Sequence, residues 1–71
     1  MMIKEQDEQF EVFLANNGTL DTVITVNGYP VTFSQEYACD FRNAEGDFSE
    51  SSFYDLAKEA IDAHIYLTTL L

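Results

Sequence analysis

LDTVITVNGYPVTF, residues 20–33, decides the fold class of this chain. Asn27-Gly28 lies between two runs of β-branched and aromatic residues. A two-residue type I′ turn needs φ > 0 at both positions, and Asn-Gly adopts such angles at low cost. The stretch therefore predicts an antiparallel hairpin, because the turn fixes which residues face each other. The expected pairs are Val26 with Tyr29, Thr25 with Pro30, Ile24 with Val31, and Thr22 with Phe33.

Pro30 predicts an edge of the sheet. In a two-residue hairpin, Thr25 and Pro30 form a non-hydrogen-bonded pair, so the amide that proline lacks would have pointed away from the hairpin. No further strand can pair fully on that side, and we expect the second strand of the hairpin to be an edge strand.

Residues 10–15 alternate in a way that predicts one more strand before the hairpin. A two-residue loop would place Glu11 beside Ile24 on the apolar face. We prefer a three-residue loop at 16–18 with Gly18 left-handed, because it gathers the large residues on one face. The preferred pairs are Phe10 with Ile24, Val12 with Thr22, and Leu14 with Leu20.

The two faces of this sheet differ in composition. The predicted core face consists of Phe10, Val12, Leu14, Leu20, Ile24, Val26, Tyr29, Val31 and Phe33. The other face carries Glu11, Phe13, Asp21, Val23, Thr25, Pro30 and Thr32. Phe13 and Val23 are diagonal neighbours there, and they are candidates for an apolar contact patch.

Residues 52–70 have the period of an amphipathic helix. Ser52 with Asp55 resembles a capping box, and Ser49 or Ser51 are alternative N-caps. The apolar stripe contains Phe53, Leu56, Ala57, Ala60, His64, Leu67 and Leu71, and it is widened by Ile61, Ala63, Ile65 and Leu70. We expect His64, the single histidine, to pack in or beside the core rather than to act chemically.

The segment 34–46 fits two structures. Tyr37, Cys39 and Phe41 keep a period of two, which favours a strand over 35–42. Tyr37 and Phe41 are also four residues apart, which suits a helical turn capped by Ser34. Residues 43–46 then predict a turn.

Together these patterns predict an α+β fold in one domain over 1–71. A small antiparallel β-meander of three or four strands packs against one C-terminal amphipathic helix. Residues 1–9 are expected to be partly frayed, residues 10–46 form the meander and a loop, and 52–70 form the helix.

The charge restricts the partners. Thirteen acids and three Lys or Arg give a formal net charge of −10. Such a chain is ill suited to bind nucleic acid directly or to bind an anionic membrane, because both need cationic side chains. The expected partner is a basic protein, such as a nucleic-acid-binding protein, and a homodimer is also expected because a core of this size gives little stability alone.

The chemistry of an enzyme is missing from the sequence. One histidine and one cysteine supply neither a zinc site nor a nucleophile with its base. Aligned on Gly46, an EF-hand would need an acid at Phe41 and a glutamate at Ser52, so the acids near Gly46 favour a solvated loop. We therefore expect a non-enzymatic protein without cofactor or metal. A single cysteine and the lack of a signal peptide or membrane span favour the cytoplasm.

Acidic residues form the best candidate binding surface. Asp55, Glu59 and Asp62 are spaced at i, i+4 and i+7 on one side of the predicted helix, and they step by about 5–6 Å, loosely the scale of successive phosphates. Simple solubility is the alternative explanation. The other candidate partner-binding residues are Tyr66 beside this row, Asp40, Glu45, Asp47 and Glu50 around the loop, and the pair Phe13 and Val23.

The plan of a meander followed by a helix reading Ala57-Lys58-Glu59-Ala60-Ile61 resembles small antitoxin modules of the HicB type. This resemblance assigns no functional residue here. Small size, strong acidity and the lack of a catalytic set also resemble accessory inhibitors carried by phages, some of which mimic DNA. The sequence thus favours an acidic inhibitor or modulator of a basic, nucleic-acid-handling protein. The alternative is an antitoxin-like or structural regulatory module that self-associates and binds one cognate protein.

Overall fold

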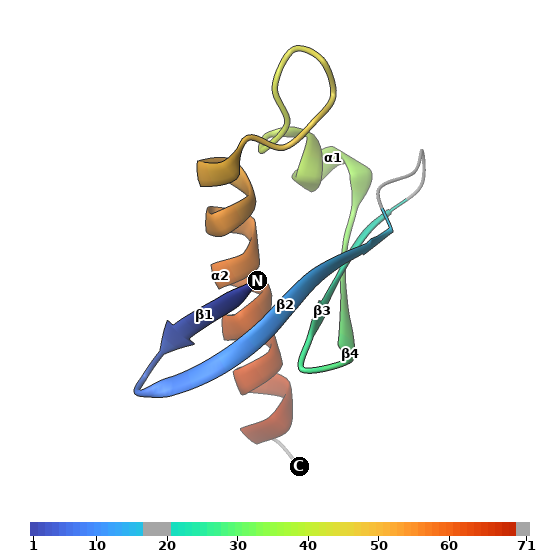
Figure 1. Ribbon diagram of the computed structural model, residues 1–71. Coiled ribbons are helices and arrows are strands. Elements are labelled where there is room, and N and C mark those ends of the chain that lie inside the picture. The colour runs from blue at the N-terminus through green and yellow to red at the C-terminus, as the bar shows by residue number, and fades with distance from the viewer. Residues whose placement is uncertain (17–20, 70–71) are drawn as a thin grey trace.

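A four-stranded antiparallel sheet and one long helix form the computed structural model, which describes residues 1–16 and 21–69. The sheet has the order β1-β2-β3-β4, and α2 crosses one of its faces (Figure 1). The α+β class is confirmed. The elements are β1 (Met2–Glu5), β2 (Glu8–Asn16), β3 (Thr22–Val26), β4 (Tyr29–Phe33), α1 (Gln35–Cys39) and α2 (Glu50–Thr69).

The β3–β4 hairpin has the predicted turn and register. Asn27 and Gly28 both have positive φ, at 51° and 85°, as a type I′ turn requires. All four predicted pairs are present, including Thr25 opposite Pro30. As predicted, β4 lies at an edge of the sheet.

The predicted register between β2 and β3 is wrong by four residues. Val12 pairs with Val26 and Leu14 with Ile24, with an irregularity between Leu14 and Asn16. The alternative that placed Glu11 beside Ile24 is wrong as well. Because the shift is even, the same side chains still face the core. The predicted positions of Gly18 and Leu20 lie outside the described residues.

Asn27 explains this register. Its backbone N–H donates to the Glu11 carbonyl at 2.8 Å, and its side-chain Oδ1 accepts from the Glu11 N–H at 2.9 Å. The turn residue thus extends the β2–β3 ladder by one more pair. We predicted the register from the loop at 16–18, whereas these two hydrogen bonds define it from the other end of β3.

The prediction that 1–9 is partly frayed is wrong, because β1 pairs with the first half of β2. Met1 and Val12 exchange two hydrogen bonds, at 2.8 and 3.0 Å. The connecting turn Gln6-Asp7 has positive φ at both residues. Ile3 supplies the driving force, since only 3% of it is exposed.

The preferred strand over 35–42 is also wrong, and the helical alternative is correct over Gln35–Cys39. Ser34 is the N-cap, and its Oγ accepts from the Tyr37 N–H at 3.2 Å. The helical turn stacks the Tyr37 ring on Phe33, with centroids 5.8 Å apart, and brings it to 5.6 Å from Phe41. These ring contacts favour helix where the period alone did not decide.

The turn predicted at 43–46 is confirmed. The Gly46 N–H donates to the Asn43 carbonyl at 3.0 Å, and the Asn43 side chain accepts from the Glu45 and Asp47 amides. Gly46 has φ = 83°, an angle that favours glycine. Arg42 holds this loop against the sheet, as described below.

The long helix α2 begins two residues earlier than 52. Ser49 is its N-cap rather than Ser52, since the Ser49 Oγ accepts from the Ser52 N–H at 3.2 Å. The Phe53 N–H donates to the Ser49 carbonyl at 2.9 Å, so the first helical turn is already complete there. Glu50 then occupies the first turn, where the helix dipole favours an acid.

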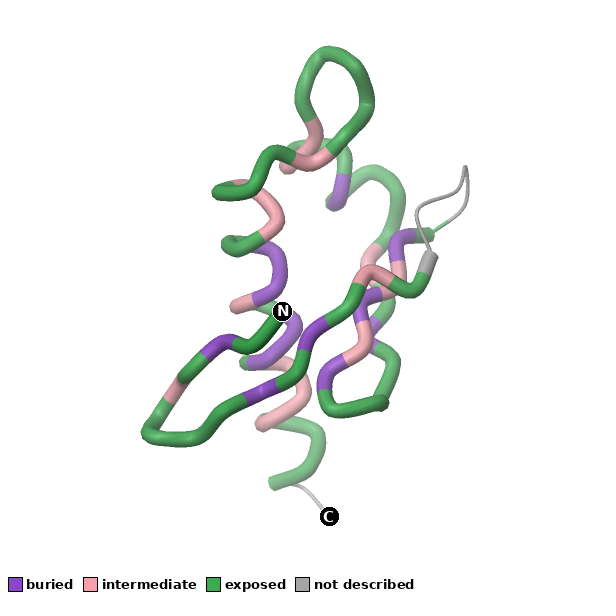
Figure 2. The backbone as a smooth tube through the Cα atoms, in the orientation of Figure 1, coloured by how far each residue is buried: buried purple, intermediate pink, exposed green. Residues whose placement is uncertain are grey.

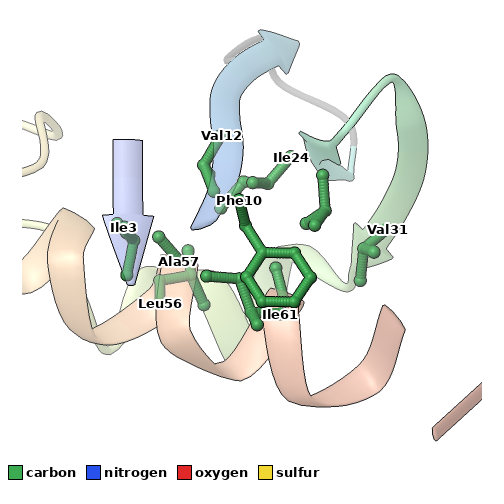
Figure 3. Packing of buried hydrophobic residues seen from close by; sticks show 10 residues of the cluster. Ile3, Phe10, Val12, Ile24, Val31, Leu56, Ala57 and Ile61 are labelled. Atoms are coloured by element: carbon green, nitrogen blue, oxygen red, sulfur yellow. The ribbon is translucent and has the colours of Figure 1, made fainter. Parts of the chain in front are cut away.

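The core lies between the sheet and the middle of α2, where the buried segments of both face each other (Figure 2). The Phe10 ring lies among aliphatic side chains from the strands and from Leu56 and Ile61 of α2 (Figure 3). The buried cluster consists of Ile3, Phe10, Val12, Ile24, Val26, Val31, Leu56, Ala57, Ala60 and Ile61.

Among the described residues assigned to apolar faces, Tyr29 at 64% and Leu67 at 56% are exposed instead. Both lie near the ends of their elements, where the facing layer covers them only in part. His64 behaves as predicted: it is half-buried at the edge of the core, with its ring 6.2 Å from Phe10 and 5.4 Å from Tyr29.

Substitutions at Asn27 should separate its two roles, the positive φ of the turn and the side-chain acceptor for the Glu11 N–H. Asn27→Asp keeps the acceptor and tolerates positive φ, so its stability should match the parent. Asn27→Gly keeps the turn but loses the acceptor for the Glu11 N–H, at a cost of about 1 kcal/mol. Asn27→Ala adds the strain of positive φ, about 1–2 kcal/mol more. Urea unfolding measures the three values, and equal stabilities for all variants would contradict the assignment.

Candidate functional site

Asp55, Glu59 and Asp62, here called the acidic row, lie on the side of α2 that faces away from the sheet. All three are exposed. The four buried residues of α2 are Leu56, Ala57, Ala60 and Ile61, and the helical period of 3.6 places the acidic row opposite them. Tyr66 continues the same side one turn later and is 65% exposed. These four predicted residues are therefore brought together.

Glu59 has a partner that the sequence did not indicate. The Tyr37 hydroxyl donates a hydrogen bond to Glu59 Oε2, which joins α1 to the acidic row. This bond to Glu59 raises the pKa of Tyr37 above its usual value, and partial burial and the charges of Glu59 and Asp40 act in the same direction. Tyr37 is therefore positioned at the border of the row. The signal was available only once 35–39 was known to be helical.

Lys58 adjoins the row in sequence but turns away from it. Its Nζ lies 3.3 Å from Glu5 Oε1 of β1 and 5.6 Å from the centre of the Tyr54 ring. The contact with Glu5 raises the pKa of Lys58, and Asp62 contributes to the same shift. Lys58 thus ties β1 to α2, and its ammonium group is directed to the β1 side of the helix.

Arg42 is likewise engaged within the fold. Its guanidinium lies 4.3 Å from the centre of the Phe48 ring and donates to the Gly46 carbonyl at 2.6 Å. It also donates to the Thr22 hydroxyl of β3 at 3.1 Å. The arginine closes the loop between α1 and α2 and fastens it to the sheet. Two of the three Lys and Arg residues are therefore used in contacts between elements.

The predicted loop acids gather at the end of the molecule where α2 begins (Figure 1). Each of them is exposed. Glu50 also lines an open hollow with Ser51, Tyr54 and Asp55, which connects this end to the acidic row. Tyr54 and Ser51 were not among the predicted site residues. The loop acids are Asp40, Glu45, Asp47 and Glu50.

Phe13 and Val23 do not join this surface. They lie on β2 and β3 with side chains on the sheet face opposite α2, and Phe13 is 53% exposed. Phe13 pairs with Thr25, so Val23 remains its diagonal neighbour despite the changed register. The ten predicted residues therefore form two surfaces on opposite sides of the molecule.

Metal ligands and thiols concern few of the described residues. Within residues 1–16 and 21–69, no group of three or more His, Cys, Asp or Glu side chains is placed to hold a metal ion. Cys39 is an exposed free thiol at the end of α1, remote in sequence from His64. In the same part of the chain, no helix is both long enough and apolar enough to cross a membrane.

Comparison with known protein families, with curated proteins and with solved structures gives no match. The likeness to HicB-type antitoxins and to phage inhibitors remains a resemblance of plan and composition.

The bond between Tyr37 and Glu59 should be visible in an absorbance titration of the tyrosines. Tyr37 should ionise at higher pH than the usual value of about 10, and Glu59→Gln should lower its pKa. Because the folded pKa is raised, the contact stabilises the fold fully below the unfolded pKa and is lost as pH rises through the folded value.

Tyr37→Phe should remove the late ionisation, and the control Tyr66→Phe should leave it in place. A titration curve that keeps the late step in Tyr37→Phe would contradict the contact.

Proposed function

We propose that this protein is a non-enzymatic binding protein that inhibits or modulates a basic, nucleic-acid-handling protein. The acidic row with Tyr66 and the loop acids would form the binding surface. On this proposal the carboxylates take the place of phosphates in a cationic groove. A phage or mobile-element origin is consistent with this type of inhibitor and forms part of the proposal.

The main support for this proposal is the distribution of acidic and basic side chains over the surface. The acidic row is exposed on one side of α2, whereas Lys58 and Arg42 are held by Glu5, Gly46 and Thr22 within the fold. The ammonium group nearest the row, that of Lys58, is bound to Glu5, and the remaining excess of exposed carboxylates attracts cations over about a Debye length. This arrangement supports recognition of Lys and Arg on a partner.

The cytoplasm is the proposed location. An exposed free thiol such as Cys39 is typical of a reducing compartment, where disulfides are rare. Proteins that handle nucleic acid work in the same compartment of a bacterial cell.

The exposed residues Phe13 and Met2 support a second candidate function. They lie on the opposite side from the acidic row and are 53% and 56% exposed. An antitoxin-like or structural regulatory module would use such an apolar face to bind itself or one cognate protein. Salt should not weaken its complex, since apolar contacts are not screened.

Neutralising the acidic row tests the first proposal. The triple variant Asp55→Asn, Glu59→Gln, Asp62→Asn keeps the side-chain shapes and retains an acceptor for Tyr37. It should weaken partner binding at least tenfold, about 1.4 kcal/mol, and flatten the salt dependence. The measurement is quantitative affinity capture from the source organism, with purified partner titrated between about 50 and about 500 mM NaCl.

A matched control removes the same number of charges elsewhere, with Asp7→Asn, Glu8→Gln and Glu11→Gln on the β1–β2 hairpin. It should bind nearly as well as the parent. Circular dichroism establishes that both variants fold. If the acidic-row variant binds like the parent with the parent's salt slope, the acids serve solubility and the proposal fails.

A further inference from the structure

The side of the sheet turned away from α2, here called the outer face, is uncovered. Phe13 and Met2 are its most exposed large apolar side chains, at 53% and 56%. No element among the described residues packs on this side, because α2 crosses the opposite face (Figure 1). The strand residues of the outer face are Met2, Lys4, Gln9, Glu11, Phe13, Val23, Thr25, Pro30 and Thr32.

Met2, Phe13, Thr25 and Pro30 form a stripe across the four strands of the outer face, with a threonine as the β3 member. Met2 pairs with Glu11, so Phe13 is its diagonal neighbour on β2. Phe13 pairs with Thr25, and Thr25 pairs with Pro30 at the far edge. The Thr25 hydroxyl donates to the Phe13 carbonyl at 3.4 Å, so this hydroxyl is engaged within the sheet.

The charge of the outer face differs from that of the whole chain. Its strand residues include one acid, Glu11, and one base, Lys4, so their charges cancel, whereas the chain carries −10. Lys4 pairs with Gln9, which makes Glu11 its diagonal neighbour. Asp21 stands just before β3 at the rim of this face. The acidic row and the loop acids lie on other sides of the molecule.

The edges of the sheet are protected against pairing with another chain. Pro30 lacks the amide that would point outward from β4. β1 is only four residues long and carries Lys4, two features that native edge strands use to prevent pairing. The outer face has no comparable protection at its centre, where Phe13 and Thr25 lie.

We propose that the outer face binds the outer face of a second copy of this chain, as a symmetric homodimer. Two molecules of charge −10 repel each other, and this repulsion is smallest when the surfaces that meet are neutral. A twofold arrangement buries Phe13 against its equivalent and lets Lys4 of each copy approach Glu11 of the other. Three strand spacings of about 4.8 Å make the stripe about 14 Å wide, the scale of a small interface.

This inference does not depend on the proposed function, and the salt dependence distinguishes the two. Salt screens the repulsion between two acidic copies, so the dimer should become at least about tenfold tighter between low and moderate ionic strength. Binding of a basic partner through the acidic row should weaken over the same range. The two associations thus respond to salt with opposite signs.

Sedimentation equilibrium of the full chain at about 20 and about 300 mM NaCl tests the dimer. The parent should dimerise more tightly at the higher salt. Phe13→Ser should shift the dissociation constant by at least tenfold toward monomer. The control Leu67→Ser removes a side chain of similar exposure, 56%, at the end of α2 and should leave the constant unchanged.

A second measurement uses the parent alone, so its result does not depend on whether Phe13→Ser folds. Dilution of the ¹⁵N-labelled parent should move the amide resonances of Met2, Phe13 and Thr25 and leave those of Asp55 and Asp62 in place. The proposal is overturned by a parent that stays monomeric at millimolar concentration in both salts. It is equally overturned by a dimer that weakens with salt, by dilution shifts confined to α2, or by a folded Phe13→Ser that dimerises like the parent.

Discussion

The pair of hydrogen bonds between Asn27 and Glu11 is the constraint on which the other contacts depend. Asn27 serves the turn through its backbone angle and serves β2 through its side chain, across 16 residues of sequence. The residue that forms the β3–β4 turn therefore also sets the register between β2 and β3. That register places Phe10 and Val12 under α2 and sets Phe13 beside Thr25 on the other side.

The sequence predicted those parts of the fold that one residue type or one period determines. Asn27-Gly28 strongly favours one turn type, so every predicted pair of the hairpin was correct. The helical period of residues 53–69 was equally plain and placed the acidic row correctly. The offset between β2 and β3 was not predictable in this way, because it depends on a side-chain hydrogen bond that leaves no periodic signal.

Two further elements show where a pattern carries too little information. β1 buries one side chain, that of Ile3. The turn after β1 places Gln6 at positive φ, which is uncommon for residues other than glycine. Tyr37 and Phe41 fit both a strand and a helix, and ring stacking with Phe33 decided between them. The contacts of Glu59 with Tyr37 and of Lys58 with Glu5 were hidden for this reason, since each needs one of these two elements.

Two of the three cationic side chains of this protein connect elements of the fold. Arg42 and Lys58 each connect elements that the backbone leaves apart: the loop with β3, and β1 with α2. Because Lys58 is bound to Glu5 and Arg42 to Gly46 and Thr22, these two cations offset only part of the charge of the acidic row. The contacts that join the elements thus also shape the surface potential.

Every strand of the sheet pairs with its neighbour in sequence, and this has a consequence during synthesis. The meander can assemble as soon as residue 33 is available, while the cover of its core face comes with residues 50–69. At about 5–20 residues per second, the nascent sheet waits roughly 2–7 s with Phe10, Ile24 and Val31 unprotected. In this interval the acids already made, among them Glu5, Glu8 and Glu11, repel other nascent chains. Acids beside hydrophobic strands are the type of residue that limits aggregation in proteins generally, and the first two strands of this chain carry them.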